Sequence, residues 1–331
     1  MDKRALKADI LLLLTAGIWG FGFVAQRAGM EDIGPFAFNG VRFVLGSLSL
    51  LPLILLRRKA PANGVLPFSF QALCYSSLVA GGCLFAGATL QQVGIMFTTA
   101  GNAGFITGLY VVFTPIFGIF LGRKTGKATW FGSVLTLIGL YFLSAKGELT
   151  SINPGDILVM MSAVFWALHV LLIDRLVKRI EPLALSAGQF AVCGVLSLAG
   201  AFFAEPFIEP LFEHINADLI GTGMFEWLPF PALINGIFTE AIVFPIDVLI
   251  PILYGGIVSV GVAYTLQVVA QRDAPPAHAT IILCFEGCFA ALGGALLLSE
   301  TFGFWSLVGF VLMLAGMIVS QWEVIRKSGM R

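Results

Sequence analysis

The sequence predicts an all-α integral membrane protein with ten transmembrane helices, arranged as two inverted repeats of five helices each. Three observations support this fold class: ten apolar stretches of membrane-spanning length, an uneven placement of basic residues, and an internal repeat. Hydrophobic residues make up 58% of the chain and charged residues 11%. A soluble domain carries roughly 25% charged residues, so a water-facing globular fold is excluded.

Each apolar stretch is long enough to form a membrane helix. A hydrocarbon core of roughly 30 Å needs about 20 residues of helix, and a helix satisfies its own backbone hydrogen bonds where water is absent. In chain order, the expected spans are residues 8–27, 35–56, 70–91, 100–121, 129–145, 156–175, 183–203, 248–269, 276–298 and 303–322.

The basic residues indicate the orientation of these spans. All but three of the 19 Lys and Arg residues lie at the N-terminus or directly after an even-numbered span. Because cytoplasmic loops carry the excess of Lys and Arg, both termini are expected to be cytoplasmic. The hydrophilic interval at about 204–247 contains seven acidic residues and no Lys or Arg, which places it on the opposite face.

An internal repeat divides the chain into two halves, residues 1–147 and 148–331. A shift of 147 residues places Asp9 on Asp156, Trp19 on Trp166 and Pro35 on Pro182. Farther along, the shift becomes 176, where Thr89-Leu-Gln matches Thr265-Leu-Gln. The extracytoplasmic insertion at about 204–247 accounts for this change of register. Five spans are an odd number, so the second copy enters the membrane from the opposite side and the repeats are inverted.

The sequence gives no sign of an enzyme. It has no glycine-rich phosphate loop, nucleophile elbow or pair of catalytic carboxylates, so no catalytic residues are assigned. The five cysteines lie within predicted spans, and none has the C-x-x-C spacing of a metal site. No metal and no cofactor are therefore expected, and a net charge of zero gives no reason to expect a nucleic-acid partner.

Several runs resemble a known family. The run from Gly155 to His169 is similar to the opening helix of an EamA-type repeat in the drug/metabolite transporter superfamily. The run from Cys284 to Glu300 resembles the ninth helix of that family, although Glu286-Gly287 stands where the family usually has Glu-Pro. The resemblance covers nearly all of the chain, and it implies a ten-helix secondary exporter of small metabolites in the inner (plasma) membrane.

Two ionisable residues near the middle of spans are candidates for proton coupling. Glu286 lies about ten residues into the ninth span, roughly 15 Å along the helix axis. A carboxyl group at that depth is able to bind a proton when it is desolvated and release it when water enters. His169 lies near the middle of the sixth span and suits a proton relay or a substrate contact. Structural roles, in which each residue is hydrogen-bonded between helices, remain open alternatives.

Other residues are candidates for substrate binding between the repeats. Paired tryptophans form stacking walls or ordinary packing contacts. Arg42 is expected to hold a carboxylate by a forked pair of hydrogen bonds, to pair with an acidic residue of the protein, or to extend outward. Gln91 and His278 are further polar residues in otherwise apolar spans. The candidate binding set is Trp19, Arg42, Tyr110, Trp166, His169, Tyr264, Gln267 and Glu286.

The predicted function is export of small metabolites such as amino acids, by alternating access between the inverted repeats. The expected partners are a small-molecule substrate, membrane lipid and, if transport is coupled, protons; the chain acts as a monomer or a homodimer. The alternatives are an exchanger of nucleotide sugars or phosphorylated metabolites, a flippase of lipid-linked substrates, and a membrane scaffold or sensor. The insertion is either a lid or a passive outer structure made of short interfacial helices.

Overall fold

The computed structural model describes residues 3–30, 33–58, 69–98, 100–144, 154–205, 246–297 and 303–328, and within these ranges all regular secondary structure is helical. The predicted insertion at 204–247 lies almost entirely outside the described residues. Helices of the first half are α1 (Lys3–Ala28), α2 (Pro35–Arg58), α3 (Phe70–Phe97), α4 (Ala100–Thr107), α5 (Tyr110–Phe120) and α6 (Lys127–Ser144). The second half contains α7 (Pro154–Leu176), α8 (Pro182–Phe203), α11 (Ile246–Leu253), the π-helix η1 (Tyr254–Tyr264), α12 (Thr265–Ala270), α13 (Pro276–Leu283), α14 (Glu286–Leu297) and α15 (Phe304–Ser328).

Eight helical stretches within the described residues are long and apolar enough to cross a membrane. They correspond to the first four predicted spans and to the sixth through ninth, so the prediction of an all-helical integral membrane protein is confirmed. The fifth and tenth predicted spans form α6 and α15, and the apolar part of α15, Leu307–Ser320, is shorter than a full span. Spanning by these two helices stays a prediction.

Large apolar side chains that face outward cover the bundle. Leu55, Phe120, Val195 and Phe304 are among the exposed large hydrophobic residues. Lipid tails are as apolar as these side chains, so the faces that a soluble protein would bury can stay on the surface of a membrane protein. The polar side chains of the spans therefore gather in the interior, where they face one another.

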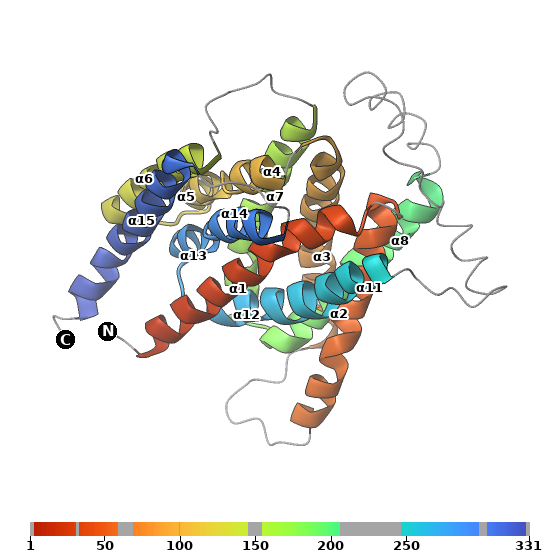
Figure 1. Ribbon diagram of the computed structural model, residues 1–331. Helices are drawn as coiled ribbons and strands as arrows, with labels where there is room; N and C mark the ends of the chain where they lie inside the picture. The colour runs from red at the N-terminus through yellow and green to blue at the C-terminus, as the bar shows by residue number, and fades with distance from the viewer. Residues whose placement is uncertain are drawn as a thin grey trace.

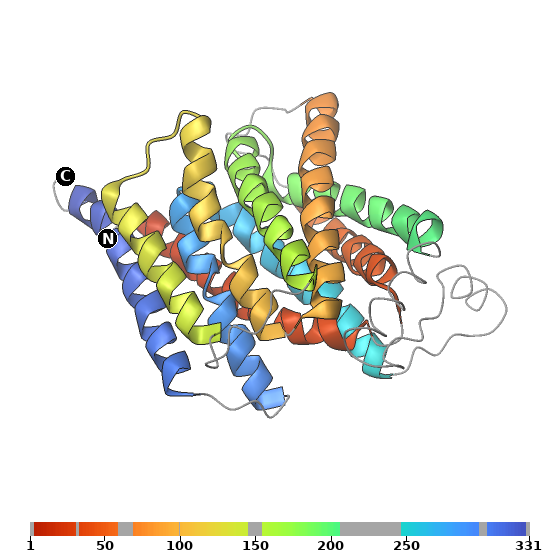
Figure 2. The same cartoon turned by 90° about the horizontal axis from the view of Figure 1, so that it is seen from above.

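The helices pack in pairs that join the two halves of the chain. Helix α2 packs along α8, α3 packs along α7, α1 packs along α14, and α6 packs along α15. Figures 1 and 2 show the α6 and α15 pair at one edge of the bundle, with the N-terminus and the C-terminus at the same end. The pairing means that most interior surfaces are made of one helix from each half.

Three of the predicted spans are not continuous α-helices. The span at 100–121 breaks between α4 and α5, and the span at 276–298 breaks between α13 and α14. At both breaks the backbone forms hydrogen bonds between residues three apart, as in a 3₁₀ turn. Examples are the bonds from Leu109 N–H to Ile106 O and from Gly287 N–H to Cys284 O. The span at 248–269 contains the π-helix η1. The ninth span is thus interrupted next to Gly287, which stands where the family usually has proline.

Glycines allow α6 and α15 to approach each other closely. A Cβ atom added to Gly139 would lie 2.7 Å from the carbonyl oxygen of Gly309, and one added to Gly132 would lie 2.7 Å from that of Gly316. Small residues at such crossings let helix backbones touch, which is a main source of helix association in lipid.

Substitution of Gly139 by valine should destabilise the protein. The added side chain meets backbone atoms of α15, which have little freedom to move, and overpacking of this kind costs about 1–3 kcal/mol. We expect a lower Tm for Gly139→Val in thermal unfolding of the detergent-solubilised protein. The matched control is Gly82→Val in α3, where an added Cβ has no atom within 4 Å. Equal Tm values for the two variants would contradict the close packing of α6 and α15.

Candidate functional site

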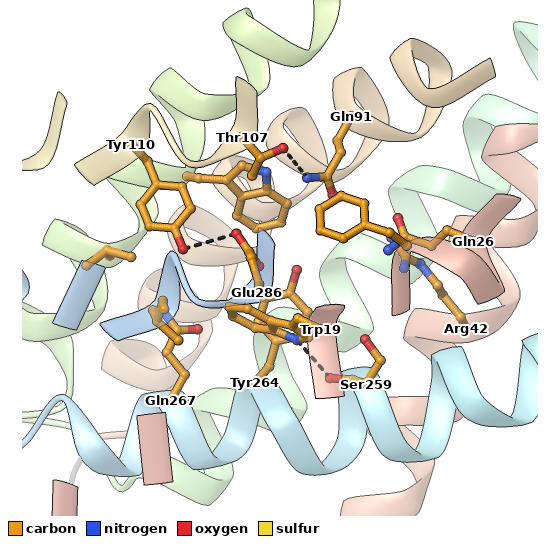
Figure 3. Close-up of a pocket in the computed structure, with 14 residues that line it drawn as sticks. Trp19, Gln26, Arg42, Gln91, Thr107, Tyr110, Ser259, Tyr264, Gln267 and Glu286 are labelled. Atoms are coloured by element: carbon orange, nitrogen blue, oxygen red, sulfur yellow. Dashed lines mark hydrogen bonds between the residues drawn. The ribbon is translucent and has the colours of Figure 1, made fainter. Parts of the chain in front are cut away.

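A cavity in the middle of the bundle is lined by polar and aromatic side chains of the spans (Figure 3). Its lining comes from helices of both halves. The lining residues are Trp19, Phe23 and Gln26 of α1, Arg42 of α2, Gln91 of α3, Thr107 of α4, Tyr110 of α5, Trp166 and Val170 of α7, Ser259 and Tyr264 of η1, Gln267 of α12, Leu283 of α13 and Glu286 of α14.

Seven of the eight predicted binding residues line this cavity, and His169 does not. His169 is fully buried behind the wall, where its Nε2 lies 2.9 Å from Oε1 of Gln189 in α8. Its ring meets the rings of Trp166 and Tyr264 edge-on. Three positions after Trp166, the helix turns this side chain toward α8 rather than toward the cavity. In this conformation His169 supports two wall residues and does not touch the cavity itself.

The cavity is narrow in this conformation. Its free volume is about 40 Å³, whereas a single water molecule needs roughly 10–15 Å³ measured in the same way. The space therefore holds a few water molecules. An organic metabolite can enter only if side chains or helices move apart.

Three aromatic side chains form one wall. Tyr264 lies between the two tryptophans, with its ring centroid 4.4 Å from that of Trp19 and 6.0 Å from that of Trp166. Trp19 Nε1 donates a hydrogen bond to the carbonyl oxygen of Ser259 at 3.3 Å. The tryptophans therefore share Tyr264 as a neighbour instead of facing each other across an open gap.

Arg42 is a buried cation at one side of the cavity, beside Gln26 in Figure 3. Its Nε donates to Oδ1 of Asn39 at 2.9 Å, and its guanidinium lies over the rings of Phe38 and Phe43. Within the described ranges, no carboxylate lies within ion-pair distance of this guanidinium. A buried charge without an opposite charge costs free energy, so the site suits an anionic group supplied from elsewhere.

Glu286 and Tyr110 meet at the two helix breaks. Tyr110 is the first residue of α5, Glu286 is the first residue of α14, and the Tyr110 hydroxyl donates to Glu286 Oε1 at 3.1 Å. The Cys284 thiol donates to the carbonyl oxygen of Gly108 at 3.3 Å, which joins the same two breaks. Transporters use helix interruptions of this kind to build substrate and ion sites within the membrane.

Several polar atoms of the lining have no partner among the described residues. Gln267 Nε2 donates to Gln271 Oε1 at 3.0 Å, but Gln267 Oε1 is buried and unpaired. Gln26 Oε1 and the indole Nε1 of Trp166 are buried and unpaired as well. Buried polar groups normally form hydrogen bonds. These atoms can therefore bind water or the polar groups of a ligand.

Some lining residues were missed by the sequence analysis. They are Phe23, Gln26, Thr107, Val170, Ser259 and Leu283. Gln26 lies seven positions after Trp19, on the same face of α1, so helical spacing from Trp19 could have identified it. The small hydroxyl residues and the aliphatic residues gave no signal, because such residues are frequent in any transmembrane helix.

Gln91 lines the cavity as a polar residue and donates from Nε2 to the hydroxyl of Thr107 at 2.9 Å. His278 lies elsewhere, between Asp9 and Ser320. Among the described residues, no group of three His, Cys, Asp or Glu side chains is placed to hold a metal ion.

Comparison with known proteins places the chain in a family. The model of the EamA-like transporter family matches residues 6–145 and 153–321. An uncharacterized transporter of Archaeoglobus fulgidus is 30% identical over 96% of this chain and 87% of its own length. The inner membrane transporter YedA of Escherichia coli K12 is 29% identical over 57% of this chain and 60% of its own length.

Mouse solute carrier family 35 member F6 is 26% identical over 64% of this chain and 61% of its own length. One crystal structure superposes with a TM-score of 0.68 at 16% identity, and it covers 96% of this chain and 98% of its own; it therefore supports the fold. The family model spans most of both halves of the chain. This chain belongs to the EamA-like transporter family of the drug/metabolite transporter superfamily, and it is a membrane transporter rather than an enzyme.

Proposed function

We propose that this chain exports small metabolites, amino acids among them, by alternating access between two inverted repeats of five helices. The observation that carries this proposal is the central cavity, which takes wall residues from both halves and contains a buried cation, a carboxyl group and aromatic side chains. An amino acid offers a carboxylate to Arg42, an ammonium group to Glu286 and a side chain to the aromatic wall.

The proposed repeats, residues 1–147 and 148–331, are supported by two observations. The family model matches the chain twice, once in each half. Residues that correspond at a shift of 176 also occupy similar positions: Tyr110 and Glu286 each begin a helix after a break, and Gln91 and Gln267 both line the cavity. In transporters of inverted repeats, the substrate lies where the two repeats meet and one repeat rocks against the other.

The proposed orientation has both termini in the cytoplasm and all ten spans in the inner membrane. The placement of basic residues supports it, and so does the position of the two termini at the same end of the bundle (Figure 1). The side of α1 that begins with Lys3, Arg4 and Lys7 then faces the cytoplasm, together with the turn between α5 and α6.

Proton coupling through Glu286 is a separate part of the proposal. Glu286 is buried, lines the cavity and accepts its hydrogen bond from a neutral tyrosine, with no cation within ion-pair distance among the described residues. A carboxyl group in such surroundings changes its protonation when water or substrate enters. Exchange of a proton for a substrate at this carboxyl would couple transport to a pH gradient.

The variant Glu286→Gln should therefore lose the response to a pH gradient and keep only a weakened exchange without a gradient, because the amide offers no charge to the ammonium group of the substrate. The measurement uses proteoliposomes and the labelled amino acid that the wild type exchanges fastest. The matched control is Glu205→Gln. Glu205 is also buried, but it accepts from the backbone N–H of Phe36 at the start of α2, away from the cavity. If Glu286→Gln retained full pH-driven transport, proton coupling through this residue would be excluded. The separate proposal that the protein transports small metabolites would be unaffected.

The variant Arg42→Met should lose affinity for a carboxylate substrate without losing stability. A hydrogen bond to a charged group contributes about 1.5–3 kcal/mol, so the KM should rise roughly 10-fold to 100-fold. The Tm should change little, because removal of a buried cation without a carboxylate partner in the described part of the chain offsets the loss of the hydrogen bond to Asn39. Unchanged transport combined with a lower Tm would show that Arg42 is structural.

A further inference from the structure

Within the described ranges, Arg42 is the one basic residue that lines the central cavity, and a neighbour on its own helix holds it in place. Asn39 lies three residues before Arg42 on α2, so the two side chains share one face of the helix. Nε of Arg42 donates to Oδ1 of Asn39 at 2.9 Å. Asn39 is fully buried and does not line the cavity, so it has no direct contact with a substrate there.

A second hydrogen bond fixes the orientation of the Asn39 amide. Its Nδ2 donates to the carbonyl oxygen of Ala88 in α3 at 3.2 Å. The carbonyl group can only accept a hydrogen bond and the Nε–H of arginine can only donate one. The amide must therefore turn its nitrogen toward α3 and its oxygen toward Arg42. Asn39 thus ties the guanidinium group of Arg42 to the backbone of α3.

The bond from Nε leaves the outer end of the guanidinium group available to a ligand. Arginine has five N–H donors, one on Nε and two on each Nη. Among the described residues, Nε pairs with Asn39, and neither Nη atom has a hydrogen-bond partner. The ring centroids of Phe38 and Phe43 lie 5.5 Å and 5.0 Å from Cζ of Arg42 and restrict its movement. The two Nη atoms are therefore the pair that can hold both oxygens of a carboxylate.

The second half of the chain has no equivalent of this pair. At the shift of 147 residues, Asn39 corresponds to Ser186 and Arg42 to Gln189. Gln189 does not line the cavity, and its Oε1 lies 2.9 Å from Nε2 of His169. The two proposed repeats therefore differ at this position. In the described part of the cavity, a substrate anion has one basic residue to bind, so the group that orients Arg42 affects the binding of any such substrate.

We propose that Asn39 is a positioning residue for substrate binding, because it holds Nε and so directs both Nη atoms of Arg42 to a substrate carboxylate. This inference rests on the proposed function, in which Arg42 binds that carboxylate. Without the acceptor oxygen of Asn39, the guanidinium group is free to turn, and Nε needs another partner. Both effects take donors away from the carboxylate, and ordering the side chain again on binding costs free energy. Affinity for the substrate then falls, while the transport rate at saturation is kept.

The test is a double-mutant cycle on the KM for exchange in proteoliposomes. The probe is the labelled amino acid that the wild type exchanges fastest among the twenty common ones. Asn39→Leu keeps a branched side chain without a hydrogen-bonding group, and it should raise KM about tenfold with kcat nearly unchanged. In the Arg42→Met background, Asn39→Leu should leave KM unchanged, because Asn39 acts through the guanidinium group.

Asn39→Asp is a second variant that keeps the acceptor atom and nearly the same volume. Its carboxylate would pair with Arg42 and compete with the substrate for the same cation. We therefore expect KM to rise at least as much as in Asn39→Leu. If Asn39 served only to join α2 to the rest of the bundle, aspartate, which still reaches Arg42, would leave KM unchanged.

Ser47→Ala is the matched control on the same helix. Ser47 donates from Oγ to the carbonyl oxygen of Ala187 in α8 at 2.9 Å, and it does not line the cavity. This variant also removes a hydrogen bond between α2 and a neighbouring helix, but it leaves Arg42 in place. It should keep the wild-type KM.

Two results would overturn the role of Asn39 and leave the proposed function standing. One is a wild-type KM in Asn39→Asp, and the other is a rise in KM for Asn39→Leu that persists in the Arg42→Met background. If Asn39→Leu does not fold, the KM of Asn39→Asp decides. A wild type that exchanges no amino acid would instead overturn carboxylate binding in the proposed function, and this inference with it.

Discussion

In the hydrocarbon core of a membrane, a polar side chain has no water to bind, so it must find a partner inside the protein or serve a ligand. This constraint explains the arrangement of the interior. Most buried polar groups of the spans are paired, such as Gln91 with Thr107 and Glu286 with Tyr110. Arg42, Gln26 and Gln267 keep unmatched charge or unpaired atoms, and all three line the central cavity. Other unpaired buried atoms, such as the hydroxyls of Ser77 and Thr136, lie away from this cavity. The unmatched charge of Arg42, together with the unpaired amide oxygens of Gln26 and Gln267, is what favours a ligand at the cavity.

The two helix breaks provide this cavity with one polar wall. An unbroken helix would use its own backbone bonds along the whole span and would present few polar atoms to the interior. At Gly108 and Cys284 the chain turns instead, and the thiol of Cys284 joins the two turns. Tyr110 and Glu286 then emerge side by side from helices of different halves. Movement of one half against the other would change the contact between Tyr110 and Glu286. The carboxyl group of Glu286 is therefore well placed to couple proton binding to such a movement.

Much of the fold was predictable from the sequence because lipid imposes simple rules. Length and hydropathy predicted the eight stretches that the structure describes as membrane-capable helices, and the runs around Trp166 and Glu286 predicted the family. Polar residues at membrane depth were likewise good predictors of the cavity, since seven candidates meet there. The exception is His169, because its direction depends on the packing of α7 against α8, which spacing along one helix does not reveal. The unmatched state of Arg42 and the order of the three aromatic rings also arise only when helices distant in sequence come together.

The most direct test of the central claim is counterflow in proteoliposomes that contain the wild-type protein, with a panel of labelled amino acids and nucleobases and no pH gradient. The account predicts that at least one compound with a free carboxylate exchanges rapidly and saturably, and that its methyl ester, which lacks the negative charge, neither exchanges nor competes. A correctly folded protein that exchanges no carboxylate compound, or that exchanges the ester equally well, would contradict a cavity built around a buried arginine.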